Sequence, residues 1–98
     1  MVKHVVTFRF NGTPAVREEI SSRFRDALLA LPEQIDILRS IEVGININPA
    51  ENWDMTLIAT VDKLEDVASY SAHPAHKAAV EIIAPYKLER ACVDYVAE

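Results

Sequence analysis

Residues 2–10 alternate strictly between two kinds of side chain, and this pattern constrains the fold more than any other segment. One side of the segment carries Val2, His4, Val6, Phe8 and Phe10. The other side carries Lys3, Val5, Thr7 and Arg9. A repeat of two residues is that of a half-buried β-strand. We therefore expect a strand here, with His4 on its apolar side.

A helix is predicted directly after this strand. Asn11-Gly12 is a turn sequence, Thr13 is a good N-cap, and Pro14 suits the first helical position. Apolar residues then recur at helical spacing as far as Leu31, and Pro32 ends the helix.

Three later segments have strand patterns, and two helices separate the last two strands. The expected strands cover residues 40–47, 53–61 and 87–96. Asp62 and Glu65 form a capping box, which predicts a short helix over 63–71. A residue before proline is pushed out of the α region, so the chain breaks at His73 and a further helix runs from Pro74 to about residue 85.

The resulting order, β-α-β-β-α-α-β, is a split βαβ arrangement. It predicts a ferredoxin-like α+β fold, in which helices cover one face of a four-stranded antiparallel sheet. A chain of 98 residues suits one domain, 1–98, and is too short for two.

Charge and composition exclude several classes of protein. The net charge of −5 and the absence of a Lys/Arg run argue against a nucleic-acid partner. No apolar run approaches the ~20 residues that span a bilayer, and the first residues lack a secretory signal, so we expect a cytoplasmic protein with no membrane partner. Cys92 is the only cysteine, which excludes an internal disulfide and favours a buried structural thiol.

The second face of the predicted sheet is unusually poor in charge. It consists of Val5, Thr7, Thr56, Ile58, Thr60, Ala91, Val93 and Tyr95. A sheet face left in water normally carries more charged side chains. We therefore expect this open face to pack against a second copy in a two-fold homodimer, the alternative being a monomer with a wet face of threonine and valine.

The segment from Tyr70 to His76 holds the densest group of chemically capable side chains. Tyr70 lies near the end of one predicted helix and His76 in the first turn of the next, so the break between them turns both toward a common space. A neutral imidazole accepts a proton, and a phenol donates a hydrogen bond to a carbonyl oxygen that gains charge. The alternative is structural, with the Tyr70 hydroxyl satisfied within the protein and His76 capping a helix or facing water.

Several blocks of the chain resemble the stress-responsive dimeric α/β-barrel (Dabb) domain family. They are Val2-Lys3-His4-Val5-Val6, Ile41-Glu42-Val43-Gly44, Trp53-Asp54-Met55-Thr56-Leu57, Tyr70 with His73-Pro74-Ala75-His76, and Val93-Asp94-Tyr95. The resemblance covers nearly the whole chain and implies a ferredoxin-like protomer that pairs into a dimeric barrel. Its plant members include a polyketide cyclase that makes an aromatic (olivetolic) acid and boiling-stable stress proteins.

The resemblance to the cyclase-like members implies a catalytic set of His76, Tyr70 and His4. In this reading His76 is the general base, Tyr70 steadies an enolate, and His4 holds Tyr70 or a substrate carbonyl. No metal and no organic cofactor are then needed. Apolar walls around a small hydrophobic or carbonyl ligand would come from Phe8, Phe24, Leu28, Val80 and Ile83, each of which is also explained as ordinary core.

The chain also departs from the cyclase pattern. Ser71 and Ala72 stand where aliphatic residues precede the His-Pro segment, and Lys77-Ala78-Ala79 replaces a more apolar stretch. These changes predict a pocket of different shape with a more polar mouth, so the substrate does not carry over.

Three other functions compete with a cofactor-free lyase or cyclase. One is a non-catalytic stress or binding protein, which predicts a filled core. Another is a cofactor-independent monooxygenase, suggested by Asn52 and Trp53, although a rim or interface position explains this tryptophan better. The third is a metal site built from His73, His76 and His4, which we rank below an apolar pocket because His73 is best interpreted as a helix cap.

Overall fold

β1 (Val2–Phe10) is an inner strand of a four-stranded antiparallel sheet with the order β2-β3-β1-β4. The computed structural model describes all 98 residues. The other strands are β2 (Ser40–Ile45), β3 (Met55–Val61) and β4 (Lys87–Val96). The alternation of β1 is observed as predicted, with every even-numbered residue buried and every odd-numbered residue after Met1 half-buried.

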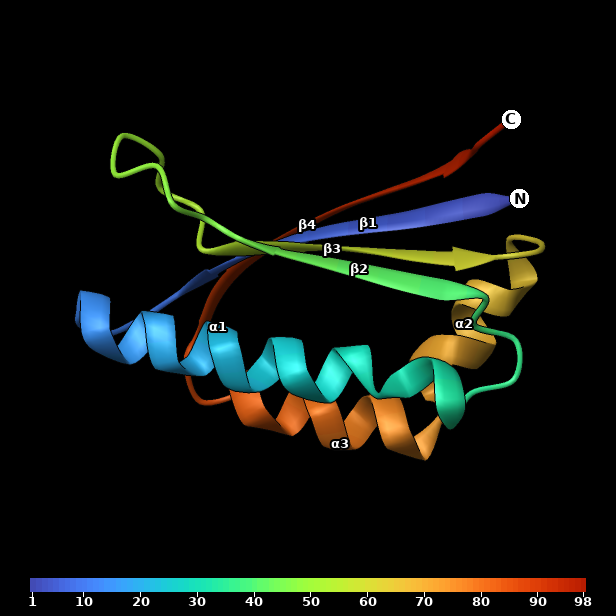
Figure 1. Cartoon of the computed structure of the whole chain (residues 1–98), viewed down its shortest axis with the longest axis horizontal. Helices are drawn as coiled ribbons and strands as arrows, with labels where there is room; N and C mark the ends of the chain where they lie inside the picture. Colours follow the sequence, from blue (N-terminus) through green and yellow to red (C-terminus); the bar gives the residue numbers. More distant parts are fainter.

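Three helices lie on one face of the sheet, and the other face is uncovered (Figure 1). They are α1 (Pro14–Leu29), α2 (Glu65–Ala72) and α3 (Pro74–Ile83). The prediction of a ferredoxin-like α+β fold is therefore confirmed. None of these helices is both long and apolar enough to cross a membrane.

The ends of α1 follow the capping chemistry of the sequence. The Thr13 hydroxyl accepts a hydrogen bond from the Val16 amide at 3.3 Å, and Pro14 occupies the first helical position. The helix ends at Leu29, two residues before the predicted Leu31. Pro32 lacks an amide hydrogen, and Leu31–Glu33 form a 3₁₀ turn instead.

The core lies between the sheet and the helices. Its fully buried side chains include Val6, Phe24, Leu28, Val61 and Ile83. The rings of Phe8 and Phe24 pack edge to face with centroids 5.6 Å apart, which fastens α1 to β1.

Three details of the sequence interpretation are wrong. Asp62 does not cap α2, which begins at Glu65, because its carboxylate forms a two-pronged ion pair with Arg39. β2 ends at Ile45, and Ile47 is 95% exposed, because the chain leaves the sheet into the loop that precedes β3.

Cys92 is the third correction, because it is exposed in the protomer and not buried. β4 is an edge strand bonded only to β1, and all of its residues are exposed. Alternation therefore gives the correct side for each residue of β4, but the helices do not extend far enough to cover it.

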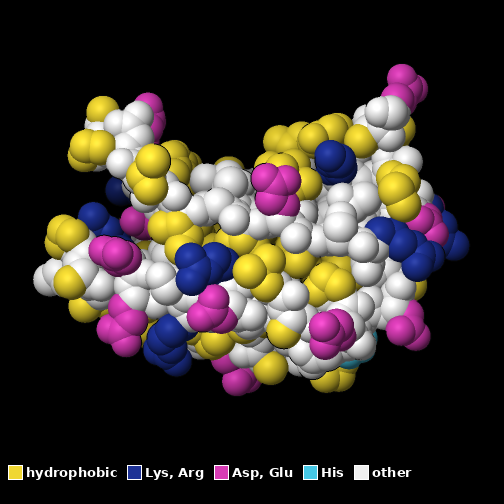
Figure 2. Space-filling view, viewed as in Figure 1, with side chains coloured by type: hydrophobic (Ala, Val, Ile, Leu, Met, Phe, Trp, Pro, Cys, Tyr) yellow, Lys and Arg dark blue, Asp and Glu magenta, His cyan; other side chains and the backbone are white.

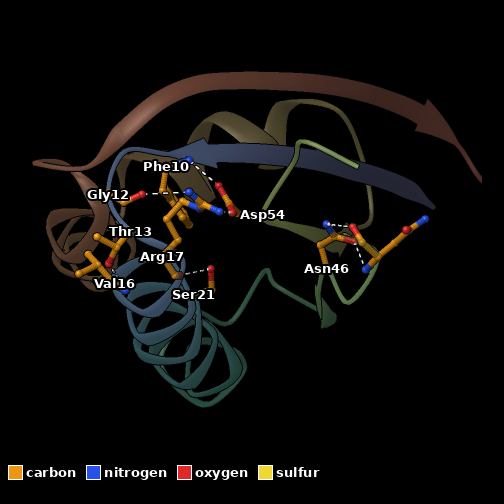
Figure 3. A network of polar contacts seen from close by, with 9 residues as sticks. Phe10, Gly12, Thr13, Val16, Arg17, Ser21, Asn46 and Asp54 are labelled. Carbon is orange, nitrogen blue, oxygen red and sulfur yellow. Dashed lines mark hydrogen bonds and ion pairs between the residues drawn. The ribbon is translucent and has the colours of Figure 1, made fainter. Parts of the chain in front are cut away.

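A polar network joins the start of α1 to the end of the β2–β3 loop (Figure 3). The Asp54 carboxylate accepts hydrogen bonds from the Phe10 amide at 2.7 Å and from Arg17 Nε at 3.2 Å. Arg17 also donates to the Gly12 carbonyl at 2.9 Å. The network fixes the turn after β1, where Gly12 has a φ of 129° that favours glycine.

Candidate functional site

The site is built around the break between α2 and α3. His73 separates the two helices in an extended conformation, with φ −65° and ψ 136°. Its Nδ1 accepts a hydrogen bond from the Ala75 amide at 3.0 Å, so the prediction that His73 caps a helix is confirmed. Tyr70, in the last turn of α2, and His76, in the first turn of α3, lie with their ring centroids 4.5 Å apart.

One hydrogen bond sets the tautomer of His76. Its Nδ1 lies 3.0 Å from the carbonyl oxygen of Ser71. Because a carbonyl can only accept, the ring proton is placed on Nδ1, and the neutral ring keeps Nε2 as an acceptor. Burial lowers the pKa of His76, the Ser71 carbonyl opposes this shift, and the charges of His4 and Arg90 add to it. His76 is therefore neutral at neutral pH.

The Tyr70 hydroxyl has no hydrogen-bond partner in the protomer. The residue is 1% exposed, and its hydroxyl is the single buried side-chain polar atom left unpaired. Burial raises the pKa of this phenol, so it remains a protonated donor. A buried polar group without a partner costs about 1–3 kcal/mol, which marks the hydroxyl as a candidate contact for a ligand.

His4 approaches the same region from β1. It is 4% exposed, and its ring meets the Tyr70 ring edge-on with centroids 6.0 Å apart. Its Nδ1 lies 2.5 Å from a carboxylate oxygen of Asp94, to which it donates. This bond fixes the ring and leaves Nε2 as the second nitrogen.

The role of Asp94 is not predicted by the sequence analysis. Asp94 lies on β4 directly opposite His4 in the antiparallel register. Cys92, two residues earlier on the same side of the strand, brings its Sγ within 3.4 Å of His4 Nδ1. The alternation of both strands was visible in the sequence, but the pairing of β4 with β1 and its register were needed to bring these residues together.

A cavity of about 200 Å³ lies at these side chains. Its lining combines the three predicted polar residues with most of the predicted apolar ones: His4, Tyr70, His76, Phe8, Phe24, Val80 and Ile83. Leu28 is not part of the lining, because its side chain is wholly buried in the core beside the cavity. The analysis missed Val6, Leu57, Ser71, Lys87 and Arg90, which complete the lining.

A second, open depression of about 680 Å³ lies between the start of α1 and the β2–β3 loop. Asn52 and Trp53 belong to its lining, whereas His76 does not. The set of Asn, Trp and His that suggested a monooxygenase is therefore not assembled in one cavity of the protomer. Trp53 is half-buried at a rim, in line with the structural interpretation.

Comparison with known families settles the relationship of the chain. The model of the stress responsive A/B barrel domain matches residues 2–97. The chain belongs to this Dabb family. A curated relative, an uncharacterized protein of Streptomyces coelicolor, is 31% identical over 83 residues, covering 84% of this chain and 86% of the relative.

Solved structures of similar proteins are dimers. A dimeric ferredoxin-like protein of unknown function from Bacteroides fragilis has a TM-score of 0.92 at 43% identity, covering 96% of this chain and 93% of that one. A dimeric ferredoxin-like protein from Thermobifida fusca has a TM-score of 0.76 at 28% identity, covering 98% and 90%. A hydroxynitrile lyase from Passiflora edulis, with a TM-score of 0.78 at 13% identity, covers 99% and 93% and shares the fold alone.

Proposed function

We propose that this Dabb protein is a homodimer that binds a small carbonyl compound in the cavity between sheet and helices and acts on it as a cofactor-free lyase or cyclase. His76 is the general base and Tyr70 the oxyanion stabiliser. The observation that carries the proposal is the unpaired, buried Tyr70 hydroxyl beside a neutral imidazole, in a cavity lined by both.

The reaction begins with removal of a proton next to a carbonyl. His76 Nε2 takes the proton from the α-carbon, and the electron pair of the broken C–H bond moves onto the carbonyl oxygen. The Tyr70 hydroxyl donates a hydrogen bond to that oxygen as its charge grows. The enolate then attacks a second carbonyl, closing a C–C bond, and the imidazolium returns the proton to the new alkoxide. Read in reverse, the same steps are those of a lyase.

His4 is the third member of the set, as a positioning residue. Its bond to Asp94 fixes the ring, and its edge contact with Tyr70 limits where the phenol can lie. A fixed phenol is a better oxyanion donor than a mobile one because no reorganisation is needed when charge develops.

The size and charge of the cavity narrow the ligand class. Sites for drug-sized ligands measure about 300–1,000 Å³, so a cavity of about 200 Å³ suits a short chain or one ring. Lys87 and Arg90 line the cavity, and neither forms an ion pair within the protomer. Two unpaired cations favour a carbonyl compound that carries a carboxylate.

We further propose that the dimer forms through the open face of the sheet. Val93 and Tyr95 are 62% and 45% exposed there, and Figure 2 shows apolar side chains along the upper side of the molecule, away from the helices. Thr56 donates to the Val6 carbonyl at 3.0 Å and lies 3.1 Å from the Thr7 hydroxyl. Because these hydroxyls already have partners, the face can be buried at little polar cost.

Binding is tested with laevulinate (4-oxopentanoate), which has a ketone and a carboxylate. In an NMR titration of the labelled protein, we expect saturable shifts at Tyr70, His76 and Arg90. The matched control, 4-hydroxypentanoate, keeps the carboxylate but lacks the carbonyl, and we expect it to bind at least about tenfold more weakly. Equal affinity for the two compounds, or shifts confined to other regions, would contradict the proposed site.

A non-catalytic binding protein is the competing function, and the same cavity supports it. It requires ligand binding to depend on Tyr70 but assigns no chemistry to His76. Binding of laevulinate without exchange of its α-protons identifies this alternative.

A further inference from the structure

We propose that His4, Cys92 and Asp94 form a zinc site on the helix-facing side of β1 and β4. The proposal is independent of the carbonyl chemistry, because it uses Nδ1 of His4 and two residues outside the cavity lining. It also differs from the set of three histidines considered from the sequence, in which His73 Nδ1 is occupied by the Ala75 amide.

The strand register assembles the cluster. His4 pairs with Asp94 across β1 and β4, and Cys92 pairs with Val6 one step along on the same side. One ligand atom from each of the three side chains, Nδ1, Sγ and a carboxylate oxygen, lies within 4.8 Å of the others. The two strands therefore provide a rigid base for all three ligands.

The distances fit a tetrahedral ion closely. Zinc bonds of about 2.0–2.1 Å to nitrogen, 2.0–2.2 Å to oxygen and 2.3 Å to sulfur imply ligand separations of about 3.5 Å to sulfur and about 3.4 Å between nitrogen and oxygen. The Cys92 sulfur lies 3.4 Å from His4 Nδ1 and 3.6 Å from Asp94 Oδ1. Only the contact of 2.5 Å between His4 and Asp94 must open, by about 1 Å.

The surroundings permit that movement. The side chain of His4 is 6% exposed and anchored, whereas that of Asp94 is 31% exposed on an edge strand and is free to rotate. The ion would replace the proton that joins Nδ1 to the carboxylate. Three protein ligands leave a fourth position for water, as in zinc sites that are not closed.

The ligand set selects the metal by its chemistry. A thiolate disfavours magnesium and calcium, which take oxygen ligands, and a mixed N, S, O set in tetrahedral geometry suits zinc. Thiolate and carboxylate together carry two negative charges, which neutralise the dication in a partly buried place.

The test uses the whole chain after treatment with a chelator and removal of the chelator. Zn²⁺ is titrated by calorimetry, and Co²⁺ serves as a spectroscopic probe, because a cobalt–thiolate bond gives a charge-transfer band. We expect one ion per protomer, a Kd of about 1 μM or tighter, and that band. C92S removes the band, and C92S and D94N each weaken zinc binding at least about tenfold.

Both substitutions lie on an exposed strand, so the fold is expected to survive, and circular dichroism checks it. H73N is the matched control, because it removes an imidazole elsewhere but keeps a capping oxygen, and we expect it to bind zinc normally. A Kd weaker than about 100 μM, the absence of the cobalt–thiolate band, or affinity lost in H73N but kept in C92S and D94N overturns the proposal.

Discussion

The rings of Tyr70 and His76 pack with their centroids 4.5 Å apart, although a break in the chain at His73 separates the helices that carry them. The break is what brings them together. In one continuous helix, residues six apart would point in different directions, at about 100° per residue. The extended conformation of His73 lets α3 return beside α2, so that a phenol and an imidazole share one small cavity.

The unpaired hydroxyl predicts opposite effects of Y70F on stability and on binding. Removing a buried polar group without a partner is expected to raise the free energy of unfolding by about 1 kcal/mol, measured with urea. The same variant is expected to bind laevulinate at least about tenfold more weakly. A clear loss of stability in Y70F would show that the hydroxyl already has a partner in the free protein.

The lowered pKa of His76 predicts acid sensitivity. The unfolded chain, with a histidine pKa near 6.5, binds more protons than the folded protein once the pH falls below that value. The contribution of this residue to stability is therefore fully present above pH 6.5 and lost as the pH falls through the folded-state pKa. Urea unfolding between about pH 7.5 and 5.5 is expected to show a shallower pH dependence in H76Q than in the unsubstituted protein, in the presence of a chelator. An NMR midpoint for His76 above 6.5 would contradict this prediction.

The proposed interface predicts that a charge on the open face separates the dimer. V93D places a carboxylate where 62% of the residue is exposed in the protomer. If a second copy covers the face, burying this charge is costly, and sedimentation should show a monomer at concentrations where the unsubstituted protein is a dimer. L64D is the matched control, because Leu64 is 59% exposed in the turn before α2. Dimers of V93D as stable as those of L64D would place the interface elsewhere.

The network at the start of α1 predicts an order of stabilities. D54A leaves the Phe10 amide without its acceptor and should cost about 1–3 kcal/mol of unfolding free energy. R17A removes a half-exposed partner and should cost about 1 kcal/mol or less. D54N, which keeps an acceptor oxygen, should fall between them in urea unfolding. An R17A variant as unstable as D54A would show that the ion pair, and not the backbone bond, fixes this turn.

Periodicity was sufficient to predict the fold and the helix break. The alternation of β1 gave the side of each residue, including His4, and Pro74 gave the position of the break. Local signals failed where a distant partner competed. Asp62 was expected to cap α2, but Arg39, far away in the sequence, holds its carboxylate.

Coverage and pairing are the two properties that the sequence pattern did not contain. The pattern placed Cys92 on the helix-facing side but not at an edge that no helix covers. Asp94 lies 90 residues from His4, and only the register of β4 against β1 makes them partners. Leu28 has the spacing of a lining residue, yet the packing of α1 leaves it behind the cavity wall.

Exchange of the α-protons of laevulinate in D₂O, followed by proton NMR, tests the proposed chemistry most directly. The protein is expected to accelerate exchange above the rate in buffer, and H76Q and Y70F are each expected to reduce the acceleration by about 100-fold or more. H73N, which removes the neighbouring imidazole and keeps the helix cap, should exchange as fast as the unsubstituted protein. Exchange at the buffer rate, or an H76Q variant as fast as the unsubstituted protein, would contradict a base at His76.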